Sequence, residues 1–78
     1  MKKDFPLLSI ISPCYNGEQY LGRFLDSVLC QDYPRIEFIL INDGSTDATQ
    51  RVVDAYTKRL TSALERFIYI RQENAGQA

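Results

Sequence analysis

Residues 38–47 read FILINDGSTD, and this stretch decides the fold of the chain. Its first half is an uninterrupted apolar run, which is typical of a buried strand in a parallel sheet. Its second half is polar, contains a glycine and leads into a segment with helical spacing. Open α/β sheets bind ligands at such junctions, because the carboxyl ends of their strands border a crevice. The stretch therefore predicts both a fold class and a candidate binding site.

Apolar periodicity predicts the other elements on either side of this stretch. Three short apolar runs are expected to form strands, at residues 7–11, 36–41 and 67–70. Pro13 is expected to close the first strand. Residues 18–31 and 47–64 carry apolar side chains at the i, i+3, i+4, i+7 spacing of an amphipathic helix. This alternation predicts a Rossmann-like α/β fold, with a parallel sheet in βαβαβ order.

Polar residues before the two helices predict how each helix is capped. Asn16 and Gln19 have the spacing of a capping box for the first helix. Ser45 or Thr46 is expected to cap the second helix. Asp47 then falls at the positive end of the helix dipole, where an acidic side chain usually has a structural role.

Composition excludes several classes of function. The chain has 78 residues and 45% hydrophobic content, which fits one small domain. Its 9 basic and 10 acidic residues give a formal charge of -1, so no nucleic acid partner is expected. It contains no histidine, which excludes Ser-His-Asp and Cys-His catalysis and histidine zinc sites. Any bound metal would need oxygen ligands, which suit magnesium or manganese.

Targeting signals and cysteines point to the cytoplasm. No apolar run approaches the ~20 residues that span a bilayer, and the first residues lack the apolar core of a secretory signal. Cys14 and Cys30 lack a CxxC spacing and are expected to stay reduced. We therefore expect a cytoplasmic protein.

The predicted sheet is larger than the two helices can cover. Right-handed crossovers put both helices on one face if the strands progress in one direction across the sheet. The strands nevertheless read as apolar on both faces, which is typical of the three-layer type of α/β fold. Residues 1–78 are therefore expected to be one truncated domain that lacks its second covering layer. The uncovered face should favour association with another copy or with the rest of the domain.

Three polar loops are expected to meet at the carboxyl edge of the sheet, at residues 12–17, 42–47 and 71–77. Tyr15 offers an aromatic ring against which a planar base can stack. Asp43 offers an acceptor for the N–H edge of a pyrimidine such as uracil. Glycines in all three loops allow close backbone approach, and the helix N-termini present free N–H groups to a diphosphate.

Plainer interpretations of the same residues stay open. Tyr15 also fits an ordinary loop aromatic, and Asp43 also fits the first position of an Asp-Gly turn. Asn16 also fits a helix cap, and Arg71 fits either a phosphate contact or a strand flank. Neither cysteine has a neighbour in sequence that would make it a nucleophile.

Four stretches in the correct order carry a resemblance to a known family: LSIISPCYNGEQYL at 8–21, SVLCQDYP at 27–34, NDGSTD at 42–47 and QENAG at 72–76. The chain resembles the N-terminal third of a family 2 glycosyltransferase with the GT-A fold. Two positions depart from the family pattern. Asn42 stands where the family usually has an aspartate, an exchange that is tolerated, and Cys30 replaces a frequent asparagine.

The resemblance implies a nucleotide-diphosphate-sugar donor, commonly a UDP-sugar, and an acceptor hydroxyl of unknown identity. It places Pro13 and Tyr15 in the nucleoside pocket and Asp43 on the base. With the neighbouring loop positions, the nucleotide-binding residues predicted are Pro13, Tyr15, Asn16, Asp43, Gly44, Asn74 and Gly76.

The resemblance also implies that the chemistry lies elsewhere in the protein. The family's catalytic base and its metal motif are expected beyond residue 78, so no catalytic residue and no metal ligand is predicted here. The full-length enzyme is expected to invert the sugar, to use magnesium or manganese, and to lie in the cytoplasm or at the membrane periphery. Two alternatives stay open, a non-catalytic nucleotide-sugar-binding module and a nucleotidyltransferase of similar fold.

Overall fold

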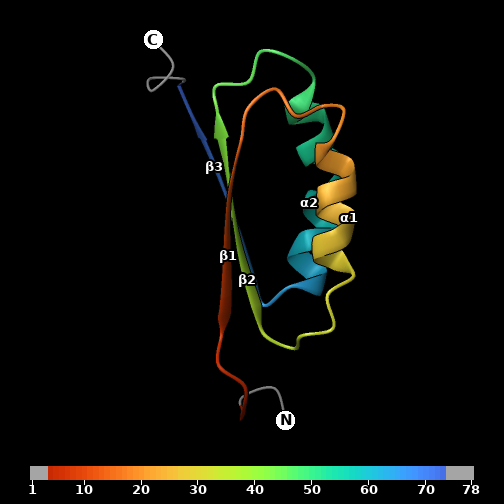
Figure 1. Cartoon of the computed structure of the whole chain (residues 1–78), viewed down its shortest axis with the longest axis vertical. Helices are drawn as coiled ribbons and strands as arrows, with labels where there is room; N and C mark the ends of the chain where they lie inside the picture. The colour runs from red at the N-terminus through yellow and green to blue at the C-terminus, as the bar shows by residue number, and fades with distance from the viewer. Residues whose placement is uncertain (1–3, 74–78) are drawn as a thin grey trace.

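The computed structural model describes residues 4–73, which form three strands and two helices. In chain order these are β1 (Leu8–Cys14), α1 (Leu21–Leu29), β2 (Ile36–Asp43), α2 (Thr49–Ala63) and β3 (Arg66–Gln72). The strands are parallel and lie in the order β1-β2-β3. Figure 1 shows both helices on the same face of the sheet. The predicted α/β fold and its βαβαβ order are confirmed.

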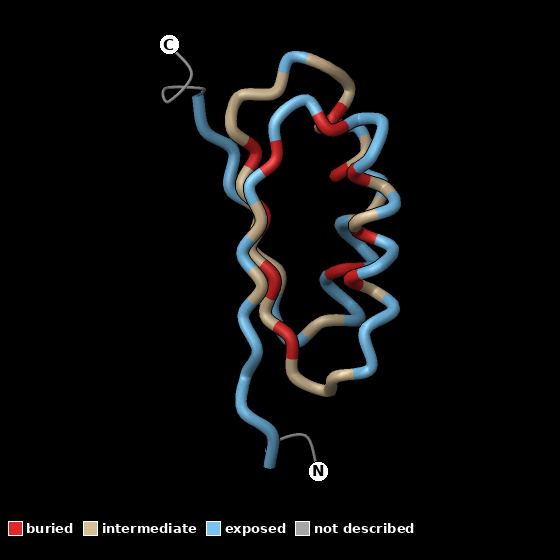
Figure 2. Tube along the Cα trace, in the orientation of Figure 1, coloured by how far each residue is buried: buried red, intermediate tan, exposed pale blue. Residues whose placement is uncertain are grey.

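The core lies between the central strand β2 and the two helices. Burial alternates along β2, so that Phe38 and Leu40 face the helices and are fully buried. Leu25 of α1 and Leu60 of α2 are fully buried opposite them. Figure 2 shows the buried positions on the facing sides of the sheet and the helices. Each such side chain contributes about 1.5–3 kcal/mol by leaving water, which holds this layer together.

The strands extend further toward their carboxyl ends than their apolar runs do. Pro13 does not close β1, because it pairs in register with Ile41 and the strand continues to Cys14. A proline is tolerated there because β1 is an edge strand, and one side of its backbone needs no ladder partner. β2 likewise continues through Asn42 to Asp43. Asp43 is thus held by the sheet and does not belong to a free loop.

Both helices are shorter than predicted, and their expected caps are wrong. α1 begins at Leu21 with Tyr20 at its N-cap position, and no side chain caps it. α2 begins at Thr49 after Ala48, so neither Ser45 nor Thr46 is its cap. The polar residues before each helix instead bond across to the loop before the other helix.

The face of the sheet opposite the helices is uncovered in the described part of the chain (Figure 1). Register places Ile39 between Ile11 and Ile68, and Ile41 between Pro13 and Ile70. Ile11 is 63% exposed and Ile70 is 41% exposed. The predicted uncovered apolar face is therefore present.

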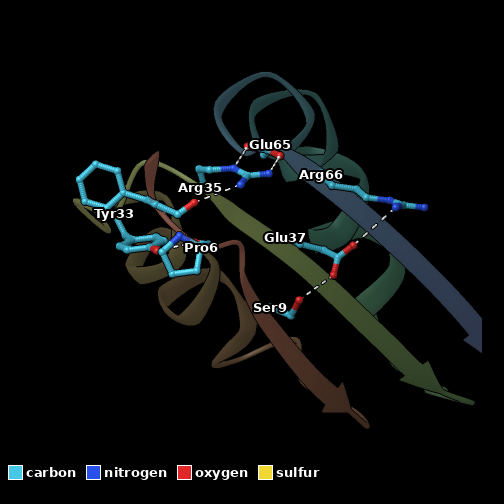
Figure 3. Close-up of polar contacts among 8 residues, drawn as sticks. Pro6, Ser9, Tyr33, Arg35, Glu37, Glu65 and Arg66 are labelled. Carbon is cyan, nitrogen blue, oxygen red and sulfur yellow. Dashed lines mark hydrogen bonds and ion pairs between the residues drawn. The ribbon is translucent and has the colours of Figure 1, made fainter. Parts of the chain in front are cut away.

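Polar side chains close the amino-terminal edge of the sheet (Figure 3). On the open face, Ser9 Oγ donates a hydrogen bond to Glu37 Oε1 at 2.7 Å, and Arg66 Nη1 lies 3.7 Å from Glu37 Oε2. Nearby, Arg35 donates two hydrogen bonds to the Glu65 carboxylate, at 2.9 and 2.7 Å. These contacts tie neighbouring strands and loops together at the end of the sheet away from the candidate site.

Cys14 and Cys30 are both free, as predicted. Neither helix within residues 4–73 is long and apolar enough to cross a membrane.

Candidate functional site

Two adjacent cavities lie at the carboxyl edge of the sheet. The smaller, about 280 Å³, is lined by Pro13, Cys14, Tyr15, Tyr20 and Asp43. The other, about 370 Å³, is lined by Gly44, Ser45, Arg71, Gln72 and Glu73. They adjoin where Asp43 is followed by Gly44, so loops after all three strands contribute to one continuous edge.

Four predicted site residues lie at this edge, namely Pro13, Tyr15, Asp43 and Gly44. The predicted Asn74 and Gly76 lie outside the described residues. A larger cavity of about 620 Å³ adjoins the C-terminal ends of both helices, at the opposite end of the molecule. The carboxyl ends of the described strands do not border this larger cavity. We therefore place the candidate site at the two smaller cavities.

Two exposed tyrosines line the smaller cavity. Tyr15 is 42% exposed and Tyr20 is 52% exposed, and neither hydroxyl has a hydrogen-bond partner among residues 4–73. Aromatic rings left bare at a cavity offer a stacking surface, and their hydroxyls are free to bond a ligand. Tyr20 is a candidate site residue that the sequence did not predict.

Gly17 is a sequence signal that could have pointed to Tyr20, because the ring packs against a position without a side chain. A Cβ built on Gly17 would lie only 2.9 Å from Tyr20 Cζ and 3.1 Å from its hydroxyl oxygen. The Tyr20 ring is thus the group that lies against Gly17, and close approach of a ligand to the backbone there stays a prediction. A larger residue at position 17 would move that ring.

Asp43 ends β2 with its carboxylate at the cavity. Gln72 Nε2 donates a hydrogen bond to Asp43 Oδ1 at 3.3 Å. No donor in the described part of the chain contacts the second oxygen, Oδ2. Gly44 follows with φ 74°, a left-handed conformation that residues with a Cβ rarely adopt. The turn thus has a backbone fixed by glycine and a carboxylate with one oxygen free.

Asn16 joins the loop after β1 to the loop after β2. Its Oδ1 accepts a hydrogen bond from Thr46 N at 2.8 Å, and its own N–H donates to Ser45 Oγ at 2.8 Å. Its φ of 50° turns the chain toward that loop. Asn16 is therefore not the cap of α1, and a direct contact of Asn16 with nucleotide stays a prediction.

Residues 17 and 18, which follow Asn16, also bond residues 47–49. Gly17 N donates to Thr49 Oγ1 at 2.8 Å, and Glu18 N donates to Asp47 Oδ2 at 3.2 Å. Ala48 N in turn donates to Glu18 Oε1 at 3.1 Å. These bonds hold the first two loops of the site as one unit.

Carboxylates occupy the N-terminal end of α2. Asp47 Oδ1 accepts the Thr49 N–H at 2.9 Å and also bonds the Thr49 hydroxyl. Partial burial raises the pKa of Asp47, but the hydrogen bonds from Thr49 and Glu18 outweigh it and hold that pKa below its usual value. The structural role predicted for Asp47 is confirmed. Glu18 and Asp47 already bond the N–H groups of Ala48 and Thr49, and binding of a diphosphate at this helix end stays a prediction.

Cys14 lines the smaller cavity from its buried side. Burial and the charge of Asp47 raise the pKa of the Cys14 thiol, so it is neutral at pH 7. A neutral thiol is a poor nucleophile, so Cys14 serves as an apolar wall.

The described part of the chain contains no cluster of side chains that could bind a divalent metal ion. No three His, Cys, Asp or Glu side chains within residues 4–73 gather where they could hold a metal. Asp43 is the acidic residue lining the smaller cavity, and one carboxylate alone does not make a site. The described residues therefore do not fit the magnesium or manganese expected for the full-length protein.

The fold and its polar edge place the chain among α/β proteins that bind ligands at the carboxyl ends of a parallel sheet. Within that class, the chain belongs to glycosyl transferase family 2, whose family model matches residues 9–78. Its fold is the Rossmann-like half of a GT-A domain.

Known relatives are similar over most of this chain. Glycosyltransferase GlyA of Streptococcus pneumoniae is 44% identical over 69 residues, which cover 88% of this chain and 9% of the relative. An uncharacterized glycosyltransferase of Rickettsia prowazekii is 41% identical over 71 residues, which cover 91% of this chain and 20% of the relative. The crystal structure of S. aureus TarS matches with a TM-score of 0.70 at 30% identity, and the match covers 86% of this chain and 12% of the TarS chain. The chain thus spans 9% to 20% of the length of these curated relatives.

Proposed function

We propose that this chain is the nucleotide-binding half of a glycosyltransferase whose donor is a UDP-sugar. One observation carries the proposal, the cavity of about 280 Å³ in which two exposed tyrosine rings and Pro13 lie beside the Asp43 carboxylate. Rings stack on a planar base, and a carboxylate accepts its N–H. A pyrimidine with a ring N–H, such as uracil, fits this combination of groups.

The diphosphate belongs, on this proposal, in the adjoining cavity of about 370 Å³. Arg71 lines that cavity and brings a cation, which attracts phosphate oxygens. Gly44 lies where the two cavities adjoin and exposes its backbone to an approaching ligand. The Asp43–Gly44 step thereby separates base recognition from phosphate binding.

The proposed reaction is the transfer of a sugar to an acceptor hydroxyl with inversion at the anomeric carbon. A carboxylate base activates that hydroxyl, and this chain lends none of its own residues to the step. The role of residues 4–73 is to bind and orient the nucleotide, and we expect the 78-residue chain alone to be inactive.

Calorimetric titration of the full-length protein with UDP, and separately with ADP, tests this function. We expect UDP to bind more tightly than ADP, because adenine has no ring N–H to donate to Asp43. Equal affinities for the two, or no binding of UDP with manganese present, would refute the proposal. Binding without any sugar transfer would favour the non-catalytic module instead.

A further inference from the structure

A buried polar residue lies directly under the proposed base-reading turn. Asn42 is 1% exposed, and its side chain points from β2 toward the helices, away from the cavity that Asp43 lines. Ser45 N donates a hydrogen bond to Asn42 Oδ1 at 3.1 Å. Asn42 Nδ2 donates to the Tyr69 hydroxyl of β3 at 2.9 Å. An amide in an apolar layer is costly unless both its ends are bonded, and here both are.

The hydrogen bonds continue from Tyr69 to the surface of α2. The Tyr69 hydroxyl donates to Gln50 Oε1 at 2.6 Å, and Gln50 Nε2 donates to Asp54 Oδ1 at 2.9 Å. Every donor in this series points the same way, from the Ser45 amide toward the Asp54 carboxylate. Each bond polarises the next, so a chain that ends on a negative charge fixes the orientation of all its members.

This orientation decides which end of the Asn42 amide meets the turn. Tyr69 gives its proton to Gln50, so its oxygen is left as an acceptor for Asn42 Nδ2. The Asn42 oxygen must then face Ser45 and close the turn that contains Asp43 and Gly44. The chain thus connects the conformation of the turn to contacts on β3 and α2.

We propose that Asn42 and Tyr69 are positioning residues that hold the Asp43–Ser45 turn in the geometry that recognises the base. The inference rests on the proposed function, since it concerns how the same nucleotide is read. Neither side chain lines the two cavities, so both act through the turn. The turn also supplies Gly44 and Ser45 to the cavity proposed for the diphosphate. Loss of either side chain should therefore weaken UDP binding more than ADP binding, because only uracil donates a ring N–H to Asp43.

Tyr69→Phe in the full-length protein tests the hydrogen bond between Tyr69 and Asn42, and Tyr56→Phe is its matched control. Each variant keeps its ring and loses one hydroxyl, and Tyr56 bonds Asp26 Oδ1 at 2.8 Å, away from the turn. We expect Tyr69→Phe to raise the Kd for UDP about 3-fold to 10-fold, the range of one neutral hydrogen bond, and to raise the Kd for ADP by a smaller factor. Tyr56→Phe should leave both values unchanged.

Two substitutions at position 42 test the hydrogen bond from Ser45 N to Asn42 Oδ1. Asn42→Leu keeps the branched shape of the side chain but leaves the Ser45 N–H without an acceptor, so the Kd for UDP should rise at least as much as in Tyr69→Phe. Asn42→Asp keeps an acceptor oxygen for that N–H, and its second oxygen can accept a hydrogen bond from the Tyr69 hydroxyl. Both contacts of position 42 then survive, so the Kd should stay within about 2-fold of native.

Equal Kd values for UDP in Tyr69→Phe and Tyr56→Phe would overturn the inference, as would native binding by Asn42→Leu. A parallel loss of UDP and ADP affinity would also overturn it, because that pattern indicates general destabilisation. Failure of the native protein to bind UDP would refute the proposed function itself, and with it this inference.

Discussion

Among single residues, Asp43 bears the most direct chemical role in the proposed site. Its carboxylate is held by β2 and by Gln72, with Oδ2 left free at the cavity. An acceptor fixed in this way discriminates between bases, because a ligand without the matching N–H leaves it unpaired. Gly44 supplies the left-handed turn that keeps the backbone after Asp43 close to the cavity edge.

Asp43→Ala in the full-length protein should weaken UDP binding by about 1–3 kcal/mol, the usual contribution of a hydrogen bond to a charged group. Isothermal calorimetry measures the change. Asp32→Ala is the matched control, because Asp32 is an exposed aspartate in the loop before β2, at the other end of the sheet. A UDP affinity that Asp43→Ala does not change would remove Asp43 from the site.

Tyr20 should contribute its ring to nucleotide binding. Tyr20→Ala should weaken UDP binding by about 1–3 kcal/mol, the range that alanine substitution gives for a stacked base. Tyr20→Phe keeps the ring and should bind UDP nearly as well as the native protein. The same calorimetric titration compares the two variants, and equal losses in both would show that the ring does not stack on the base.

At the scale of elements, the polar residues between strands and helices work in pairs. α1 begins later than its sequence pattern predicts because Asn16 and Glu18 bond the loop after β2 and Gly17 bonds Thr49 at the start of α2. The strands run longer than predicted because ladder hydrogen bonds involve the backbone and do not depend on apolar side chains. Helical periodicity and strand hydrophobicity therefore located each element correctly. Both patterns misplaced the ends of the elements that lie near the candidate site.

The N-terminus of α2 predicts a pH dependence of stability. Asp47 has a folded-state pKa below its unfolded value, so its stabilising effect is complete above the unfolded pKa and is lost as pH falls through the folded pKa. Asp47→Asn should therefore lower the melting temperature at neutral pH, and this difference should shrink below about pH 4, the ordinary range of an aspartate. Thermal unfolding from pH 7 down to pH 2 measures it. A difference that stays constant over that range would contradict the assignment.

For the whole molecule, the central question is what covers the open face of the sheet. Two rows of three apolar residues lie there, framed by Ser9, Glu37 and Arg66 at one edge. Exposed apolar area of this kind favours association. We keep the proposal that residues 1–78 are one incomplete domain whose open face meets the rest of the protein or a second copy.

The isolated 78-residue chain should self-associate through this face. Sedimentation velocity should show dimers or larger species that dissociate on dilution. Ile11→Lys should shift the distribution toward monomer, because Ile11 is 63% exposed and a charge there opposes apolar contact. The control Lys58→Ala changes an exposed residue of α2, on the covered side. A monodisperse native monomer would contradict the prediction.

The sequence by itself determined the order of the elements, the parallel sheet and the position of Asp43 at its carboxyl edge. Those features follow from periodicity and strand-to-turn junctions, which are local and can be read within ten to twenty residues. Only the tertiary structure decided that Tyr20 lines the cavity, that Asn16 joins two loops, and that Asn42 bonds Tyr69. The reason is register: Asn16 and Ser45 are 29 residues apart, and Asn42 and Tyr69 are 27 apart, so strand pairing and helix packing alone bring them within hydrogen-bond distance.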